Sequence, residues 1–237
     1  MAFKAILFDL DGTLLPMEDQ DRFIKTYFHS LTEYMAAYGY DRDEFTAAMW
    51  QSVGAMMKND GSDINENAFW REFIKIYGER GAADKEHIDD FYSHDFIKAK
   101  VTCGYTARAK EIVELVKELG LRAVLATNPV FPRVATEARI GWAGLVPEDF
   151  ELITSYENSS YAKPKAEYYE EILRKLDLTP EECVMVGNDT RDDMSAEALG
   201  MRVFLLTNCL INESGVDISK YPHGDFSALA EYLKALN

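Results

Sequence analysis

The amino-acid sequence predicts a parallel α/β core interrupted by a smaller helical insertion. From residue 104 onward, short apolar runs alternate with amphipathic helical patterns, as in a parallel sheet covered by helices on both faces. By contrast, a stretch of roughly eighty residues after the first apolar run shows helical spacing, many aromatic residues and no strand pattern. We therefore expect residues 1–16 and 101–237 to form the core domain, and residues 17–100 to form an all-helical domain.

The first predicted strand covers residues 3–8, where the apolar run FKAILF ends in the turn signal Asp11-Gly12. The insertion then shows apolar residues at three- and four-residue steps, the spacing of one face of a helix. Its four groups are Phe23, Tyr27, Leu31, Tyr34 and Met35; Phe45, Met49, Val53 and Met56; Phe69, Phe73, Ile76 and Tyr77; and Ile88, Phe91, Phe96 and Ile97. We expect aromatic residues such as Trp50 and Trp70 to pack the core of the insertion rather than form a substrate cage.

Strands and helices alternate through the rest of the chain. Short apolar runs predict strands at residues 122–126, 151–154, 183–186 and 202–206. Helical patterns cover residues 107–119, 167–176, 194–199 and 226–236. Gly120 and Gly200 follow two of these helices, at positions that favour a left-handed cap.

Composition and charge exclude several classes of protein. Hydrophobic residues make up 47% of the chain, which is enough for a sizeable packed core. The net charge of −16 argues against nucleic acid and anionic membranes as partners, because both require a basic surface. No apolar stretch is long enough to span a membrane. The three scattered cysteines suit neither a disulfide framework nor a zinc cluster, and no signal peptide is evident, so we expect a cytoplasmic protein with reduced thiols.

Polar residues follow the ends of four predicted strands. The segment from Asp9 to Thr13 follows the first strand, and Thr127-Asn128 follows the second. Lys163 lies beyond the third strand. The carboxyl ends of parallel strands share one edge of a sheet, where ligands bind, so we expect these side chains to meet. The fourth strand adds an acidic loop to that edge: Asn188, Asp189, Thr190, Arg191, Asp192 and Asp193.

Several carboxylates in a small space repel one another and require a cation. Oxygen ligands favour Mg²⁺, which keeps bound waters and often binds a substrate phosphate. We expect Asp9, Asp189 and the backbone carbonyl of Asp11 to bind the metal directly. Lys163 can offset the charge of a phosphate.

The remaining polar groups suggest how a phosphate is bound and cleaved. We expect hydrogen bonds to phosphoryl oxygens from Thr127 and Asn128, and from free N–H groups in the Gly12-Thr13 turn. Asp9 would attack phosphorus and form an aspartyl-phosphate. Asp11, two residues on, would give a proton to the leaving oxygen and later take one from water.

These residues resemble the motifs of the haloacid dehalogenase-like (HAD) superfamily. The motifs appear in order as FDLDGTL with Asp9 and Asp11, LATN with Thr127, AKP with Lys163, and the acidic loop from Gly187 to Asp193. The resemblance implies a three-layer, Rossmann-like core with a helical cap inserted just after the first motif. Such a cap closes over the site, excludes water and supplies substrate selectivity.

The fourth motif departs from the usual pattern, because it reads Gly-Asn-Asp where Gly-Asp is common. Asn188 therefore stands at the usual acid position. We expect Asp189 to bind the metal and Asp193 to support it, since their spacing matches one form of the motif. Asn188 and Asp192 are the alternative ligands.

The resemblance also implies the type of reaction. Haloalkanoic acid dehalogenases of this superfamily lack an acid at the position of Asp11 and need no magnesium. We therefore predict a Mg²⁺-dependent phosphomonoesterase that acts on a small phosphorylated metabolite. The alternatives are a phosphomutase acting on a sugar phosphate, a non-catalytic phosphate-binding regulatory protein, and an acidic structural module. No pattern in the sequence identifies the substrate or the oligomeric state.

Overall fold

The computed structural model describes residues 3–236, and its centre is one parallel sheet. The six strands lie in the order β3-β2-β1-β4-β5-β6. β1 (Ala5–Phe8) pairs with β2 (Arg122–Leu125) on one side and with β4 (Cys183–Gly187) on the other. The chain order therefore reverses between β1 and β4, which is the position where open α/β sheets bind ligands. The remaining strands are β3 (Leu152–Ile153), β5 (Arg202–Leu206) and β6 (His223–Gly224).

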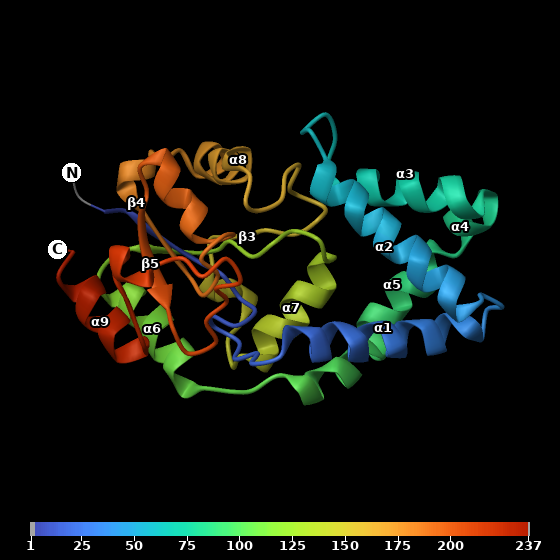
Figure 1. The fold of residues 1–237 in the computed structure, drawn as a ribbon, viewed down its shortest axis with the longest axis horizontal. Coiled ribbons are helices and arrows are strands. Elements are labelled where there is room, and N and C mark those ends of the chain that lie inside the picture. Colours follow the sequence, from blue (N-terminus) through green and yellow to red (C-terminus); the bar gives the residue numbers. More distant parts are fainter. Residues whose placement is uncertain (1–2, 237) are drawn as a thin grey trace.

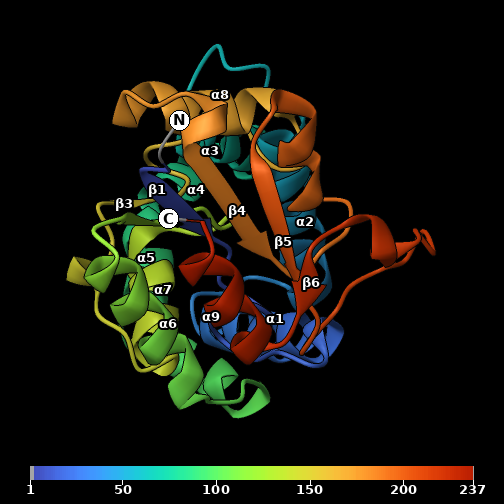
Figure 2. The same ribbon diagram turned by 90° about the vertical axis from the view of Figure 1, so that its left-hand side faces the viewer.

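Helices cover both faces of the sheet, because its central strands are apolar on both sides. Ile6 and Phe8 of β1 belong to the apolar core shared with α6 (Ala107–Glu118), α7 (Arg133–Trp142) and α9 (Phe226–Lys234). The alternate residues Ala5 and Leu7 belong to a second core, shared with α8 (Ala166–Leu176) and the 3₁₀ helix η4 (Met194–Leu199). Figure 2 shows α8 on one side of the strands and α6 and α9 on the other. The predicted three-layer, Rossmann-like α/β core is confirmed.

The described chain between β1 and α6 contains helices and no strand. Figure 1 shows this helical part lying beside the sheet. Its elements are α1 (Gln20–Ala36), α2 (Arg42–Lys58), α3 (Asn65–Tyr77), α4 (Glu79–Ala83), α5 (Lys85–His94) and η1 (Phe96–Thr102). The side chain of Asp19 accepts a hydrogen bond from the N–H of Arg22 at 2.8 Å, which fixes the start of α1. The two connections to the core cross side by side, where the N–H of Gly104 donates to the carbonyl of Pro16 at 2.8 Å.

Several predicted elements require correction. The fourth apolar group of the insertion does not form a single helix, because α5 ends at His94 and the 3₁₀ helix η1 follows. Ile97, in η1, is 52% exposed rather than buried. Ile76, predicted on a buried face, is 40% exposed. Residues 194–199 form a 3₁₀ helix, and the third strand contains only two residues.

The sequence analysis missed α7 and β6. It also missed three short 3₁₀ helices: η2 (Pro147–Asp149), η3 (Pro180–Glu182) and η5 (Ile218–Lys220).

Other features agree with the sequence analysis. Gly120 and Gly200 follow their helices with φ of 72° and 95°, as expected of left-handed caps. Cys103, Cys183 and Cys209 are free thiols. In the part of the chain that the structure describes, no helix has both the length and the apolar character needed to cross a membrane. The cytoplasmic location stays a prediction.

Candidate active site

The four polar segments meet at the carboxyl edge of the sheet, beside the reversal between β1 and β4. Asp9 directly follows β1, and its N–H donates to the carbonyl of Val186 in β4 at 2.9 Å. A cavity of about 140 Å³ lies at this edge. Its polar lining comes from every predicted segment: Asp9, Asp11, Thr127, Asn128, Lys163, Asn188, Asp189, Asp192 and Asp193. Side chains up to 184 residues apart, Asp9 and Asp193, therefore share one small space.

Lys163 is the buried cation of this site. Its Nζ donates to Asp9 Oδ1 at 2.9 Å and to Asp193 Oδ1 at 2.6 Å, and its side chain is 1% exposed. Burial by itself would lower the pKa of Lys163, but the two carboxylates raise it well above its usual range. Lys163 therefore stays charged and holds Asp9 in place.

Asp193 supports Lys163 from behind the cavity. Its Oδ2 accepts the N–H of Asp189 at 3.0 Å, so both of its carboxylate oxygens are engaged. Gly187 makes this position possible, because a Cβ at Gly187 would lie 2.1 Å from the Asp193 carboxyl. Burial, together with Asp9, raises the pKa of Asp193 to about 7, although Lys163 opposes the shift. The geometry favours Asp193 as a support for Lys163 and the loop rather than as a direct metal ligand.

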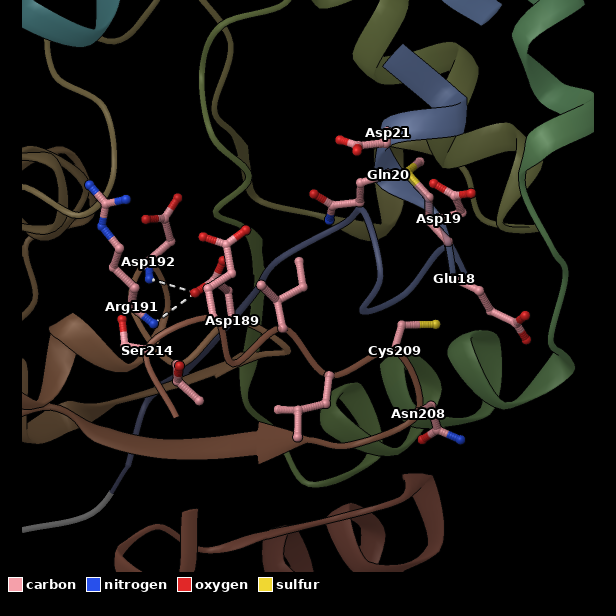
Figure 3. Close-up of a pocket in the computed structure, with 15 residues that line it drawn as sticks. Glu18, Asp19, Gln20, Asp21, Asp189, Arg191, Asp192, Asn208, Cys209 and Ser214 are labelled. Atoms are coloured by element: carbon pink, nitrogen blue, oxygen red, sulfur yellow. Dashed lines mark hydrogen bonds between the residues drawn. The ribbon is translucent and has the colours of Figure 1, made fainter. Parts of the chain in front are cut away.

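Asn188 and Asp189 differ in how their side chains are used. Asn188 is 1% exposed; its Oδ1 accepts from Thr13 Oγ1 at 3.0 Å and its Nδ2 donates to the carbonyl of Cys209 at 2.6 Å. Asp189 Oδ1 accepts the N–H groups of Arg191 and Asp192, as Figure 3 shows, and Asp189 lines the catalytic cavity. The geometry therefore favours Asp189 over Asn188 as the metal ligand.

The Gly12-Thr13 turn does not offer the free N–H groups expected from the sequence. The N–H of Gly12 donates to the carbonyl of Leu15 at 2.8 Å, and that of Thr13 to the carbonyl of Leu10 at 3.1 Å. Neither Gly12 nor Thr13 lines the catalytic cavity. The turn closes on itself, so its N–H groups stabilise the loop. The expectation that these two N–H groups are free is therefore wrong, and phosphate binding by Gly12 and Thr13 stays a prediction.

Asp11 pairs with an arginine that the sequence analysis did not single out. The guanidinium of Arg139 donates to Asp11 Oδ2, and the arginine side chain is 1% exposed. Asp11 Oδ1 is buried and meets no hydrogen-bond partner among the described residues. Burial raises the pKa of Asp11, Arg139 opposes the shift, and Asp9 adds to it. A raised pKa suits a carboxyl group that must start the reaction protonated.

The position of Arg139 in the sequence could have predicted a buried partner for it. It lies on α7 four residues after Ala135 and three before Trp142, and all three residues are buried. A charged residue on the apolar face of a helix requires a buried partner, so its position predicts an ion pair once the helix is recognised. The guanidinium carbon also lies 4.3 Å from the centre of the Phe131 ring.

The donor groups fit a magnesium ion. Within residues 3–236, no three His, Cys, Asp or Glu side chains are grouped as a complete metal cage. Mg²⁺ seldom needs such a cage, because it is usually bound by one or two carboxylates, waters and a substrate phosphate. Asp9 and Asp189 line the same cavity from neighbouring strands, and both provide oxygen ligands.

A wider hollow of about 680 Å³ opens beside the catalytic cavity. Figure 3 shows it between the segment that leads into the first turn of α1, with Glu18, Asp19 and Asp21, and the loop that carries Asp189 and Arg191. Most of its charged lining residues are acidic. The hollow shares Gln20, Asp189, Asp192 and Ile211 with the catalytic cavity.

The family model for haloacid dehalogenase-like hydrolases matches residues 3–200. The chain belongs to this family. Curated relatives include the pyrophosphatase PpaX of Bacillus cereus (strain Q1), which is 24% identical over 202 residues, 85% of this chain and 82% of the relative. The family match and the phosphatases among its relatives support the predicted enzyme class, a hydrolase of the HAD-like family.

Solved structures of similar fold include phosphatases and dehalogenases of the haloacid dehalogenase-like family. The HAD phosphatase from Thermococcus onnurineus has a TM-score of 0.58 and 18% identity, with 98% of each chain covered. The 2-haloacid dehalogenase from Pseudomonas syringae pv. Tomato DC3000 has a TM-score of 0.64 and 16% identity, with 99% of this chain and 100% of that chain covered. One fold thus serves two reactions, so the reaction must be argued from the site.

Proposed function

We propose that this haloacid dehalogenase-like hydrolase is a Mg²⁺-dependent phosphomonoesterase that acts through an aspartyl-phosphate. The observation that carries the proposal is the second carboxyl group, Asp11, which lines one cavity with Asp9 and Lys163. A dehalogenase of the superfamily needs no acid at this position. A phosphatase needs one, because the alcohol that leaves phosphorus must receive a proton.

The nucleophile is positioned by its hydrogen bonds. Lys163 holds Asp9 Oδ1 at 2.9 Å, whereas Oδ2 accepts only a long hydrogen bond of 3.4 Å from Thr13. An Asp9 oxygen forms a bond to phosphorus, and the bond from phosphorus to the alcohol oxygen breaks. The electron pair of that bond stays on the alcohol oxygen, which takes the proton from Asp11.

The second half of the reaction returns the site to its starting state. Water attacks the phosphorus of the aspartyl-phosphate and gives a proton to Asp11. The bond between phosphorus and Asp9 then breaks, so inorganic phosphate is released and the Asp9 carboxylate is restored. Mg²⁺, held by Asp9, Asp189 and the carbonyl of Asp11, would supply positive charge beside the phosphoryl oxygens.

In this proposal, the substrate phosphate is bound by groups that line the catalytic cavity. Thr127 and Asn128 follow β2 there, and Lys163 supplies the buried charge. Among residues 3–236, no acceptor lies at hydrogen-bond geometry from the N–H groups of Leu10 and Asp11. These N–H groups, rather than those of Gly12 and Thr13, are therefore the backbone donors in the first motif.

Residues 17–100 serve as a cap domain in this proposal. Gln20, the first residue of α1, lines the catalytic cavity together with the core residues. The chain passes between the helical part and the core at two adjacent connections, near Pro16 and Gly104. Hydrogen bonds also hold the helical part on the core, since the N–H groups of Asn65 and Glu66 donate to the carbonyls of Ser159 and Tyr156, each at 2.8 Å. In this proposal, the helical part covers the site and excludes water from it.

The test is release of phosphate from 4-nitrophenyl phosphate with and without Mg²⁺. Asp9→Asn should abolish metal-dependent release while the circular dichroism spectrum stays unchanged. Asp217→Asn, an exposed aspartate that caps η5, is the matched control and should keep full activity. Release by Asp9→Asn at the parental rate would rule out the proposed nucleophile.

Product analysis separates the proposal from its alternatives. A phosphomutase would isomerise a sugar phosphate such as glucose 1-phosphate without net release of phosphate. A non-catalytic phosphate-binding protein would bind Mg²⁺ and phosphate without turnover. A phosphomonoesterase releases inorganic phosphate and alcohol in equal amounts.

A further inference from the structure

An apolar cavity of about 110 Å³ lies next to the catalytic cavity. Its walls come from the helical part, from the core loop at residues 130–132 and from Tyr156, and no lining residue is charged. Val130 and Phe131 line both cavities. They lie two and three residues after Asn128 in the chain, so the apolar space begins where the proposed phosphate-binding residues end.

The polar atoms on this wall are mostly paired. The hydroxyl groups of Tyr27 and Tyr92 hydrogen-bond to each other at 2.6 Å, and burial raises the pKa of both, so they stay neutral. The indole N–H of Trp70 is buried and meets no acceptor of normal geometry among the described residues. The Tyr156 hydroxyl lies close enough for the indole to affect its pKa, but the two do not align in a hydrogen bond.

The size and chemistry of this space suit a small apolar group. An apolar cavity of this order excludes water and binds a compact hydrocarbon, since water there lacks polar partners. The sequence predicted that Trp50 and Trp70 would pack the core of the insertion. Trp70 is 8% exposed and packs in the apolar core as predicted, and it also lines this cavity. Trp50 does not: it lines the cavity but is 50% exposed and stacks on Phe28.

The wide hollow beside the catalytic cavity is acidic and disfavours a substrate with additional negative charge. The wide hollow in Figure 3 presents Glu18, Asp19 and Asp21 opposite Asp189 and Asp192. A leaving group with a second phosphate or a carboxylate would be repelled there. A neutral, apolar leaving group avoids this repulsion and has a cavity of its own.

We propose that the substrate is a phosphate monoester whose alcohol carries a compact aromatic or branched apolar group, bound in the cavity between α1, α2, α3, α5 and residues 130–132. This inference rests on the proposed phosphomonoesterase function. The ester phosphorus lies at Asp9, and the alcohol passes Val130 and Phe131 into the apolar space. An acceptor atom at the far end of the apolar group would pair with the Trp70 N–H.

The first experiment compares benzyl phosphate with methyl phosphate. Their alcohols have nearly the same acidity, so a difference in kcat/KM reports binding of the ring rather than leaving-group chemistry. We expect kcat/KM to be at least roughly tenfold higher for benzyl phosphate. Pyrophosphate should be a poorer substrate than either ester.

The second experiment fills the cavity. Val53 lies on α2 and lines the cavity, so Val53→Phe should lower the ratio of kcat/KM for benzyl phosphate to that for methyl phosphate by about tenfold. Ile74→Phe, on the exposed side of α3, is the matched control and should leave the ratio unchanged. Ile24→Phe, on α1, fills the same space and replaces Val53→Phe if that variant does not fold.

Benzyl alcohol provides a readout that needs no turnover. It should inhibit hydrolysis competitively and change the tryptophan fluorescence in a saturable manner, since Trp50 and Trp70 line the cavity. Val53→Phe should abolish this signal and Ile74→Phe should retain it.

The outcomes separate the two proposals. Phosphate release with equal kcat/KM for the two esters, or with pyrophosphate preferred, overturns the apolar subsite and leaves the phosphomonoesterase standing. Benzyl alcohol that binds without competing with the ester also overturns it, because the cavity would then hold a different ligand. No release from any ester overturns both proposals.

Discussion

The buried guanidinium of Arg139 hydrogen-bonds to Asp11, the proposed proton donor, from a helix 128 residues further along the chain. The arginine is held in place on several sides. Its Nε donates to the carbonyl of Ala135 at 3.3 Å, and its guanidinium lies over the Phe131 ring. The pair fixes Asp11 Oδ2, whereas Oδ1 is buried and has no hydrogen-bond partner among the described residues. Arg139 is thus a positioning residue, and it also contacts the residue that separates the catalytic and apolar cavities.

Arg139→Met should lower the free energy of unfolding by about 2–3 kcal/mol, because it removes the buried guanidinium and leaves Asp11 Oδ2 without its hydrogen-bond donor. Urea denaturation measures the change. Arg133→Met is the control on the same helix; its pair with Glu137 is about 40% exposed, so its loss should change stability by less than about 1 kcal/mol. Equal losses of stability in the two variants would show that the Arg139–Asp11 pair stabilises the protein no more than the exposed Arg133–Glu137 pair does.

Asp11→Asn should reduce kcat for benzyl phosphate by about 10²- to 10⁴-fold, because the alkoxide then leaves without a proton. The loss should be much smaller for 4-nitrophenyl phosphate, whose phenolate leaves readily without one. Steady-state kinetics on both esters measures the contrast. Equal losses on the two substrates would assign Asp11 a structural role instead of proton transfer.

Removal of Mg²⁺ with EDTA should abolish phosphate release, and Mg²⁺ should restore it better than the larger Ca²⁺. Asp189→Asn should raise the Mg²⁺ concentration for half-maximal activity at least tenfold, as loss of a ligand requires. Asp192→Asn should have the smaller effect, and the exposed control Asp217→Asn should have none. A larger effect at Asp192 would reassign the metal ligand within the loop.

Gly12→Ala should destabilise the protein by about 2–4 kcal/mol, because the substitution combines backbone strain with a steric clash. Gly12 has φ of 84°, and a Cβ there would lie 2.3 Å from Asn188 Nδ2, which is tied to Cys209. Gly120→Ala is the matched control: its φ is 72° and no atom lies within 4 Å of the added Cβ, so it should cost about 1 kcal/mol. Thermal unfolding of both variants measures the difference, and similar values would show that Asn188 yields to the methyl group.

The sequence alone identified most of the core and of its catalytic edge. Asp9, Thr127 and Asn188 each follow an apolar run that forms a strand, and parallel strands of one sheet end at the same edge. These predictions rest on local periodicity and on topology, so they required no knowledge of side-chain packing. The helical character of residues 20–102 followed in the same way.

Only the tertiary structure decided which groups face substrate and which hold the loops. Local sequence cannot show that the N–H groups of Gly12 and Thr13 bond within their own turn. Nor can it show that the side chain of Asn188 forms hydrogen bonds with Thr13 and Cys209. The partner of Arg139 and the apolar cavity beside Phe131 depend on contacts between segments far apart in the chain. The physical reason is that periodicity determines which side of an element is buried, whereas the partner on that side is set by the packing of the whole chain.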